Sequence, residues 1–310
     1  MATAAERNHM TTKSRKLGRM ALKEERTAYL FVLLPCLGFL IFTVSPLIFS
    51  AYASTTDWTG VNDMVFNNFQ NYKDLFTDGD FGKSLINTII YLIGIPIGMI
   101  LGLLLALGMN KKIPGVRALR TMYYIPVISS VVAISILWSW IFNYDYGPLN
   151  MIIKALTGIH GPAWLSDEAM VKVALIIFMV WNGLGNSIIL YLAGLQNIPR
   201  IYYEAAEIDG ANFWQKFRNI TIPLISPVTF FILVTSIIGG MQVFTQVLIM
   251  VPDGGTNYSA ATVVFYEYQK SFTSGAMGYG SAIAWILAII IFVLTYINFK
   301  LQSKWVSYME

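Results

Sequence analysis

The sequence predicts an all-α integral membrane protein with six transmembrane helices and a polar helix between the fourth and fifth of them. Hydrophobic residues make up 56% of the 310 residues and charged residues only 12%, and the mean hydropathy is +0.59. An ordinary soluble domain carries about 25% charged residues. None of the charged residues of this chain lies within its long apolar stretches.

Each apolar stretch is long enough to cross a bilayer, because about 20 helical residues span about 30 Å of hydrocarbon. The six stretches cover approximately residues 29–52, 85–109, 123–142, 173–195, 222–251 and 281–299. The first follows 28 mostly polar and basic residues and is longer than the apolar core of a signal peptide, so we expect it to remain as a membrane span.

This pattern predicts three regions along the chain. A basic tail occupies residues 1–28, a transmembrane domain occupies residues 29–300, and a C-terminal tail occupies residues 301–310. Within the transmembrane domain, residues 196–221 form a connection that we call the polar loop.

Basic residues predict the orientation in the membrane. Sixteen of the 21 Lys and Arg residues lie on the side that holds both termini and the polar loop. The five on the other side are Lys73, Lys83, Lys154, Lys172 and Lys270. The positive-inside rule therefore puts both termini and the polar loop in the cytoplasm. The net charge of +4 reflects this topology, and no nucleic-acid partner is expected.

Motifs for catalysis or metal binding are not recognisable in the sequence. Cys36 is the sole cysteine, and His9 and His160 lie on opposite predicted sides of the membrane. The tripeptide at 82–84 matches the end of a phosphate-binding loop, but Thr77 occupies the place of its first glycine. We therefore expect a protein that is not an enzyme, with no catalytic residue, no metal site and no cofactor of its own.

Transport against a gradient would then need an ion gradient or an energy source on another chain. Ion-driven carriers usually hold a charged side chain inside the bundle, and none lies in these spans. Sodium can also be held by backbone carbonyls at a broken helix. A stand-alone secondary carrier therefore remains the alternative. A structural or interaction protein is a weaker one, because it leaves the polar loop unexplained.

The polar loop has the pattern of two short amphipathic helices. Ile201, Ala205 and Ile208 recur at i, i+4 and i+7, which places them on one face of a helix that Gly210 ends. From periodicity alone, an interfacial helix that only packs on lipid is the favoured interpretation.

The second predicted helix of the polar loop follows that glycine. Phe213, Phe217 and Ile220 repeat the apolar spacing, and Pro223 is expected to close the helix where the fifth span begins.

The spacing of these residues resembles the cytoplasmic signature of permease subunits of binding-protein-dependent ABC importers. Glu204-Ala205-Ala206 is followed after three residues by Gly210, and after nine more by a segment that ends at Pro223, with Ile222 at the place of a leucine. Other segments are similar to the sugar branch, which includes the maltose, glycerol-phosphate and multiple-sugar permeases. They are 195–199, Tyr203, 209–211, 240–244, 277–282 and 305–306.

The resemblance, over about residues 25–308, implies a coupling role for the polar loop. Its first helix would sit in a cleft of an ATPase, with Glu204 facing a basic residue. The residues implied in coupling are Glu204, Ala205, Ala206, Asp209, Gly210 and Phe213. The chain lacks the extra N-terminal spans and the large external insertion of the longer maltose permease.

The resemblance also implies partners and a location. The partners are a second, homologous permease, two copies of a cytoplasmic ATPase that binds ATP and Mg²⁺, and an extracytoplasmic sugar-binding protein. The expected location is the cytoplasmic membrane of a bacterium or archaeon, and the expected cargo is an oligosaccharide or related carbohydrate.

A substrate path is implied along the fifth span and the end of the fourth. The residues placed near the substrate are Gly183, Asn186, Thr235, Gly239, Gln242 and Gln246. Amides suit sugar hydroxyls because they both donate and accept hydrogen bonds, and Trp181 or Phe244 would stack on sugar faces. Hydrogen bonding between helices is the alternative role for each polar residue.

Two further expectations concern small and charged residues in the spans. The glycines at 94, 98 and 102 form a small face with Ala106, for which we expect packing between subunits. Because no Lys or Arg lies within a span, a neutral sugar is favoured over an anionic one.

Overall fold

The computed structural model describes residues 19–111 and 114–307, and nearly all of their regular structure is helical. Among these residues the sole β-type pairing is an isolated bridge between Thr56 and Phe66. The predicted all-α class is therefore confirmed. The chain divides into two compact units, residues 1–52 and 53–310, which are described separately.

The first unit is a nearly continuous helical segment. It consists of α1 (Arg19–Phe39), the π-helical turn η2 (Leu40–Val44) and α2 (Ser45–Ala53). From Glu24 onward most of its apolar side chains are exposed, and Phe42 reaches 81%. The apolar length and this exposure fit a helix whose surface is covered by lipid or by another protein.

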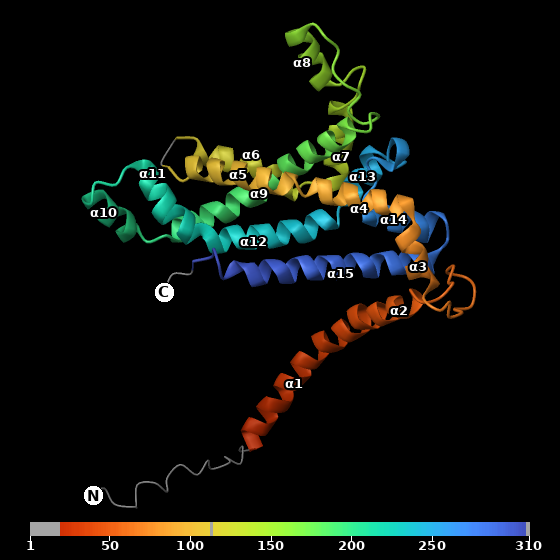
Figure 1. The fold of residues 1–310 in the computed structure, drawn as a ribbon. Coiled ribbons are helices and arrows are strands. Elements are labelled where there is room, and N and C mark those ends of the chain that lie inside the picture. The colour runs from red at the N-terminus through yellow and green to blue at the C-terminus, as the bar shows by residue number, and fades with distance from the viewer. Residues whose placement is uncertain (1–18, 112–113, 308–310) are drawn as a thin grey trace, which may run out of the picture. The chain divides into compact units, whose positions relative to one another are not determined.

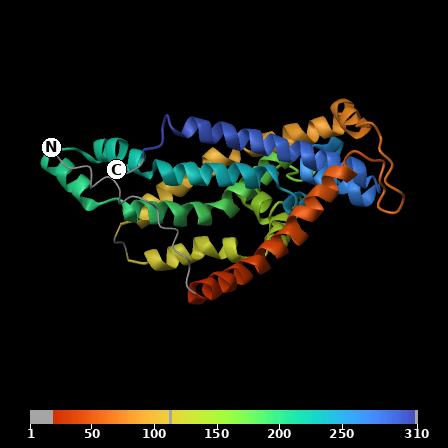
Figure 2. The same ribbon diagram turned by 90° about the horizontal axis from the view of Figure 1, so that it is seen from below.

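The second unit is built around long helices that run side by side. They are α4 (Gly79–Tyr91), α5 (Gly94–Met109), α9 (Met170–Asn197), α12 (Ile222–Met241) and α15 (Met277–Gln302). Figure 2 shows α12 between α9 and α15, and α12 contacts both. Five helical segments of the described chain are long and apolar enough to cross a membrane: Glu24–Ala53, Gly79–Met109, Met170–Asn197, Phe213–Met241 and Met277–Gln302.

The predicted third span, over 123–142, is broken in the structure. Its residues belong to α6 (Val116–Ile128) and α7 (Val131–Ile141), which meet at an angle of 102°. Ser129 and Ser130 adopt ψ angles of 152° and 126°, so the backbone is extended for two residues and the helix stops. Counted as one broken span, this pair brings the number of spans to the predicted six.

The fifth span begins and ends earlier than predicted. α11 (Phe213–Lys216) continues through the π-helical turn η3 (Phe217–Thr221) into α12, so the helix runs through Pro223 instead of closing there. Pro223 occupies the first turn of α12 and follows the π turn, where a missing amide hydrogen is tolerated. The helix ends at Met241, and the short α13 (Thr245–Met250) follows a break.

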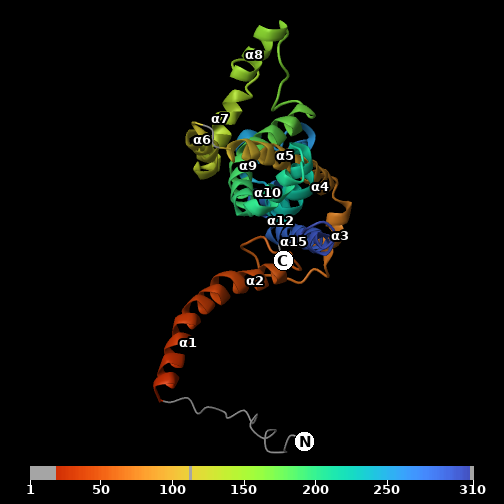
Figure 3. The ribbon, with the colours of Figure 1, turned by 90° about the vertical axis from the view of Figure 1, so that its left-hand side faces the viewer.

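The two ends of the bundle carry different short elements. At one end lie α3 (Gln70–Thr77), η4 (Thr256–Tyr258), α14 (Val263–Tyr268) and the π turn η5 (Gln269–Thr273). At the other end, where α15 ends, lie α10 (Arg200–Ile208) and α11 (Figure 1). The helix α8 (Pro148–Thr157) projects away from the long helices (Figure 3).

Buried side chains form three clusters that hold the long helices together. One cluster joins α5, α9 and α12 through Ala106, Ile188 and Ile225. A second joins α7, α9 and α13 around Phe142 and Phe178, and a third joins α3, α12, α14 and α15. The space between the first two clusters contains the cavity described below.

Candidate functional site: an exposed helical loop and a central cavity

The polar loop forms two helices separated by a glycine turn, as predicted. Gly210 has φ of +75°, a conformation that disfavours side chains with a Cβ atom, and it lets the Ala211 amide donate to the Ala206 carbonyl at 2.8 Å. Asn212 then caps α11, because its side chain accepts from the Gln215 amide and its own amide donates to the Gln215 side chain.

Two side-chain contacts tie α10 to the helix that follows. Lys216 Nζ lies 2.9 Å from Oε1 of Glu207, and the hydroxyls of Tyr203 and Thr221 are 2.9 Å apart. Tyr203 also packs against the cluster that contains Ile225. The loop is therefore attached to the base of α12 on its inner side.

The outer side of the loop is apolar and uncovered in this chain. Ile201 is 68% exposed and Ile208 is 88% exposed, so the predicted stripe does not pack on the bundle. Phe213 and Trp214, at the start of α11, are also exposed. Glu204 is exposed beside this stripe. Such a surface, apolar with carboxylates around it, is suited to contact with another protein or with the membrane surface.

The predicted coupling residues therefore lie together on one short segment. Ala205 and Asp209 are exposed as well, whereas Ala206 is partly buried on the inner side of α10. Gly210 has no atom within 4 Å of the position of a Cβ atom, so its role is conformational and does not come from tight packing.

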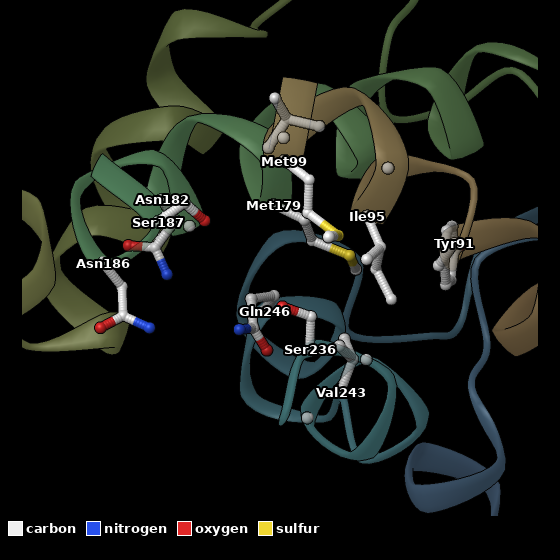
Figure 4. A pocket seen from close by; sticks show the side chains of 16 residues that line it. Tyr91, Ile95, Met99, Met179, Asn182, Asn186, Ser187, Ser236, Val243 and Gln246 are labelled. Carbon is white, nitrogen blue, oxygen red and sulfur yellow. The ribbon is translucent and has the colours of Figure 1, made fainter. Parts of the chain in front are cut away.

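The cavity lies between α5, α9 and α12 and has a volume of about 300 Å³. Apart from Tyr91 of α4, its polar side chains come from α9, α12 and α13. They are Asn182, Asn186, Ser187, Ser236 and Gln246. Figure 4 shows Asn182 and Asn186 across the cavity from Ser236 and Gln246. None of the described residues that line the cavity is charged.

Glycines make room for the cavity. A Cβ atom built on Gly98, Gly183 or Gly239 meets no atom within 4 Å, so these positions face open space. Asn182 adds an unused hydrogen-bonding group, since its Oδ1 is buried and has no partner among the described residues. A small uncharged polar ligand can fill such a space and satisfy this acceptor.

The end of the cavity that is nearer to α14 is held by polar contacts. The Tyr91 hydroxyl donates to the Ala260 carbonyl at 3.0 Å. The Thr262 hydroxyl donates to the Val243 carbonyl at 2.6 Å, which anchors the break between α12 and α13. These contacts position Gln246, one turn beyond the break, at the cavity wall.

Four of the six predicted substrate residues line this cavity, and two do not. Gly183, Asn186, Gly239 and Gln246 line it. Thr235 is exposed elsewhere on α12, and its hydroxyl donates to the carbonyls of Phe231 and Ile232.

Gln242 lines a different pocket, of about 480 Å³, beside α14 and α15. This pocket also contains Glu267, whose pKa is raised by burial although Ser271 donates a hydrogen bond to it. Gln242 and Gln246 thus face different spaces because the helix breaks between them.

The expected aromatic walls do not line the cavity. Trp181 packs on Trp138 with ring centroids 5.2 Å apart, and Phe244 packs on Tyr268 at 5.0 Å. Met99 and Met179 occupy the wall instead (Figure 4).

The sequence reasoning also missed Asn182 as a lining residue. The signal was present, because Asn182 and Asn186 are four residues apart and so share one face of α9.

The glycine face of α5 packs within the chain and not between subunits as expected. A Cβ atom on Gly102 would lie 2.7 Å from Cβ of Ser187, and one on Gly94 would lie 3.3 Å from Cγ2 of Val180. Both neighbours belong to α9. Gly98, between them, opens into the cavity.

A family model described as "Binding-protein-dependent transport system inner membrane component" matches residues 94–306. Among individual proteins, the probable ABC transporter permease protein YesP of Bacillus subtilis is 34% identical over 297 residues, covering 94% of this chain and 96% of that protein. The lactose transport system permease protein LacF of Rhizobium radiobacter is 35% identical, covering 84% of this chain and 88% of that protein. The multiple sugar-binding transport system permease protein MsmF of Streptococcus mutans is 32% identical, with coverages of 88% and 94%.

Solved structures share the fold. A chain of a bacterial ABC transporter involved in the import of the acidic polysaccharide alginate superimposes with a TM-score of 0.81 at 22% identity, covering 92% of this chain and 98% of that one. A chain of the bacterial alginate ABC transporter in complex with an alginate pentasaccharide-bound periplasmic protein gives 0.80 at 22% identity, with coverages of 92% and 96%.

Proposed function

Because this chain belongs to the family of binding-protein-dependent transport system inner membrane components, we propose that it is the permease subunit of an ATP-driven importer of an oligosaccharide or related carbohydrate. The family consists of transport components and not of enzymes, and the chain is a multi-pass membrane protein. We place ATP hydrolysis, with its ATP and Mg²⁺, on two copies of a separate cytoplasmic ATPase.

The observation that carries the proposal is the outward-facing apolar stripe of α10. Ile201 and Ile208 are exposed at one end of the bundle, on a helix that contacts Lys216 of α11 and Thr221 of η3, the segments that lead into α12. When a bound protein displaces a helix attached in this way, the adjoining membrane span moves with it. Glu204, exposed beside the stripe, supplies a negative charge for a basic cleft on the ATPase.

Coupling then follows from the connection between the loop and the spans. When ATP closes the ATPase dimer, α10 moves with it and carries the base of α12 through the contacts of Lys216 and Thr221. The glycine turn at Gly210 keeps the two short helices at a set angle. Ala205 and Ala206 are small enough for the close approach of another backbone.

The substrate path on this chain is proposed to include the central cavity. Asn182, Asn186 and Gln246 present amide donors and acceptors toward one space, which suits the many hydroxyls of a carbohydrate. The absence of charge on the described lining residues favours a neutral sugar, because a buried anion without a cation is costly. We do not include Thr235 or Gln242 in this path.

The names of the relatives support a carbohydrate cargo. A lactose permease and a multiple-sugar permease are among the proteins to which this chain is similar over most of its length. An extracytoplasmic binding protein would deliver the sugar, and a second, homologous permease would form the other half of the path. The basic residues favour cytoplasmic termini and a cytoplasmic polar loop in the cell membrane of a bacterium or archaeon.

The experiment that tests the proposal is purification of the tagged chain, followed by reconstitution. We expect the tagged chain to co-purify with one kind of ATPase and with a second permease. We also expect the reconstituted complex to hydrolyse ATP faster when a loaded sugar-binding protein is added. A chain that purifies alone and takes up its solute with only an ion gradient would overturn the proposal and support the secondary carrier instead.

A further inference from the structure

A second pocket lies between α6 and α9, toward the end of the bundle that carries the polar loop. It has a volume of about 370 Å³. Its polar wall contains Arg120, Tyr124 and Gln196, and its apolar wall contains Ile189 and Ala193. This pocket shares no lining residue with the central cavity.

Arg120 has no acidic partner among the residues that the structure describes. One terminal nitrogen, Nη2, donates to the Met109 carbonyl at 3.1 Å. Its Nε atom is buried and has no hydrogen-bond partner, and Arg120 forms no ion pair with any described residue. An unsatisfied buried donor on a cation is costly, and a guanidinium fork matches the oxygens of a phosphate closely.

The sequence places the pocket near the predicted boundary between the membrane and water. Arg120 precedes the predicted span 123–142 by three residues, and Gln196 is next to the last residue of α9. Ile189 lies seven residues before Gln196, which places it about 10 Å deeper along the helix. The polar wall is therefore at headgroup level and the apolar wall is beside the hydrocarbon.

The surroundings of the pocket also favour an anion. Arg117, one turn earlier on α6, and Lys111, in the connection before α6, are both exposed. Neither forms an ion pair with another described residue. Basic pockets between transmembrane helices attract anionic lipid headgroups, and exposed cations nearby add to that attraction.

We propose that this pocket binds an anionic phospholipid such as phosphatidylglycerol. The Arg120 guanidinium holds the headgroup phosphate, Tyr124 and Gln196 contact its polar remainder, and one acyl chain lies along Ile189 and Ala193. A free phosphate ion would supply the same charge but would leave the apolar wall uncovered. Only two residues connect α9 to α10. A lipid bound between α6 and α9 therefore holds these two helices together next to the polar loop.

The test uses the complete purified complex, in which lipids that stay bound are identified by native mass spectrometry. Its titrated probes are phosphatidylglycerol, phosphatidylethanolamine and inorganic phosphate. Wild-type complex is expected to retain phosphatidylglycerol selectively. Arg120→Gln is expected to weaken that binding about tenfold, as for loss of a charge-assisted hydrogen bond.

Two further variants keep the test decisive. Ala193→Phe fills the apolar wall without changing charge and is expected to weaken phosphatidylglycerol binding similarly. Arg117→Gln removes one positive charge at a position one turn away. It is expected to change phosphatidylglycerol binding by less than about twofold, because this charge is exposed and screened.

Three outcomes would overturn the proposal. The first is equal retention of phosphatidylglycerol by wild type, Arg120→Gln and Ala193→Phe. The second is displacement of the lipid by inorganic phosphate, which would make the site one for free phosphate. The third is a cross-link from position 120 to an acidic residue of a partner subunit, which would make the pocket a protein interface.

Discussion

Asp78 and Tyr266 are 188 positions apart in the sequence, and the Tyr266 hydroxyl donates a hydrogen bond of 2.5 Å to Oδ2 of Asp78. Tyr279 donates to the same oxygen at 2.6 Å. The other carboxylate oxygen, Oδ1, accepts from the backbone amides of Asp80 and Phe81 and so caps α4. One carboxylate thus joins the start of α4 to α14 and α15, at the end of the bundle away from the polar loop.

Asp78→Ala is expected to destabilise the protein by about 1–3 kcal/mol, because it removes a helix cap and leaves the buried Tyr266 without its acceptor. Asp78→Asn is expected to cost less, since asparagine caps a helix equally well. Thermal unfolding in detergent measures both. Asp63→Asn, in an exposed loop, is the control. An Asp78→Ala protein that unfolds at the wild-type temperature would contradict this role.

Asp78 is also expected to make the stability of the fold depend on pH. Burial raises the pKa of Asp78, but hydrogen bonds from Tyr266, Tyr279 and two backbone amides outweigh it, so the pKa lies below its ordinary value of 3.8. A carboxyl with a lowered folded pKa stabilises the fold fully above its unfolded pKa and loses this effect as the pH falls through the folded pKa. The difference in unfolding temperature between wild type and Asp78→Asn is therefore expected to be constant near neutral pH and to narrow below about pH 4.

Substitutions at two glycines of α9 distinguish the effect of filling the cavity from the effect of disturbing helix packing. Gly183→Leu is expected to abolish uptake at normal expression, because its side chain enters open space in the cavity. At Gly185 a Cβ atom would lie 2.1 Å from the Tyr123 carbonyl oxygen, so Gly185→Ala is expected to cost about 1–3 kcal/mol through overpacking. Uptake and expression level are measured for both. Full uptake by Gly183→Leu would remove the cavity from the substrate path.

The amides of the cavity are expected to contribute to sugar recognition. Asn186→Ala and Gln246→Ala should each raise the half-saturating concentration of the loaded binding protein or lower uptake by about 2–10-fold, as for loss of one hydrogen bond. Gln242→Ala, in the other pocket, is the matched control and should transport normally. The measurement is uptake into proteoliposomes with neutral and anionic sugars. A clear preference for an anionic sugar would contradict the charge reasoning.

Substitutions in the polar loop are expected to uncouple transport. Glu204→Lys places a cation against the proposed basic cleft, and Gly210→Pro imposes a negative φ where the chain has +75°. Both are expected to abolish uptake while the protein still reaches the membrane. Glu207→Gln breaks only an exposed ion pair and should cost less than about 1 kcal/mol. Wild-type uptake in both of the first two variants would refute the coupling role.

Cysteine labelling tests the orientation. The positive-inside rule places the segments 53–84, 143–172 and 252–280 outside the cell. Single cysteines at Asp63, Thr157 and Thr256, in a Cys36→Ala background, occupy exposed positions in these segments. They are expected to react with an impermeant thiol reagent in intact cells. A cysteine at Asn212, exposed in the polar loop, is expected to react only after lysis. The reverse pattern would invert the topology and place the polar loop out of reach of a cytoplasmic ATPase.

The sequence by itself predicted the apolar segments that can form spans and the polar loop between the fourth and fifth of them, although not the exact limits of the third and fifth spans. Hydropathy is a property of each segment and its solvent, so the apolar stretches predict spans without knowledge of their neighbours. The glycine turn at Gly210 was also predictable, because a helix with a 3.6-residue stripe ends where a glycine permits positive φ. The sequence did not show that the stripe of Ile201 and Ile208 faces outward, since periodicity defines a face but not what covers it.

Only the tertiary structure decided which polar residues share a space. Gln242 and Gln246 are four residues apart and would share a face on a continuous helix, but the break after Met241 turns them toward different pockets. The extended serines at 129 and 130 likewise bend a segment that is apolar throughout. The break after Met241 depends on a long-range contact, the hydrogen bond from the Thr262 hydroxyl to the Val243 carbonyl, which satisfies a backbone group no longer paired within a helix. Local sequence does not show which distant residue will hydrogen-bond the backbone groups that a break leaves unpaired in the membrane. The cavity therefore became visible only in the packed structure.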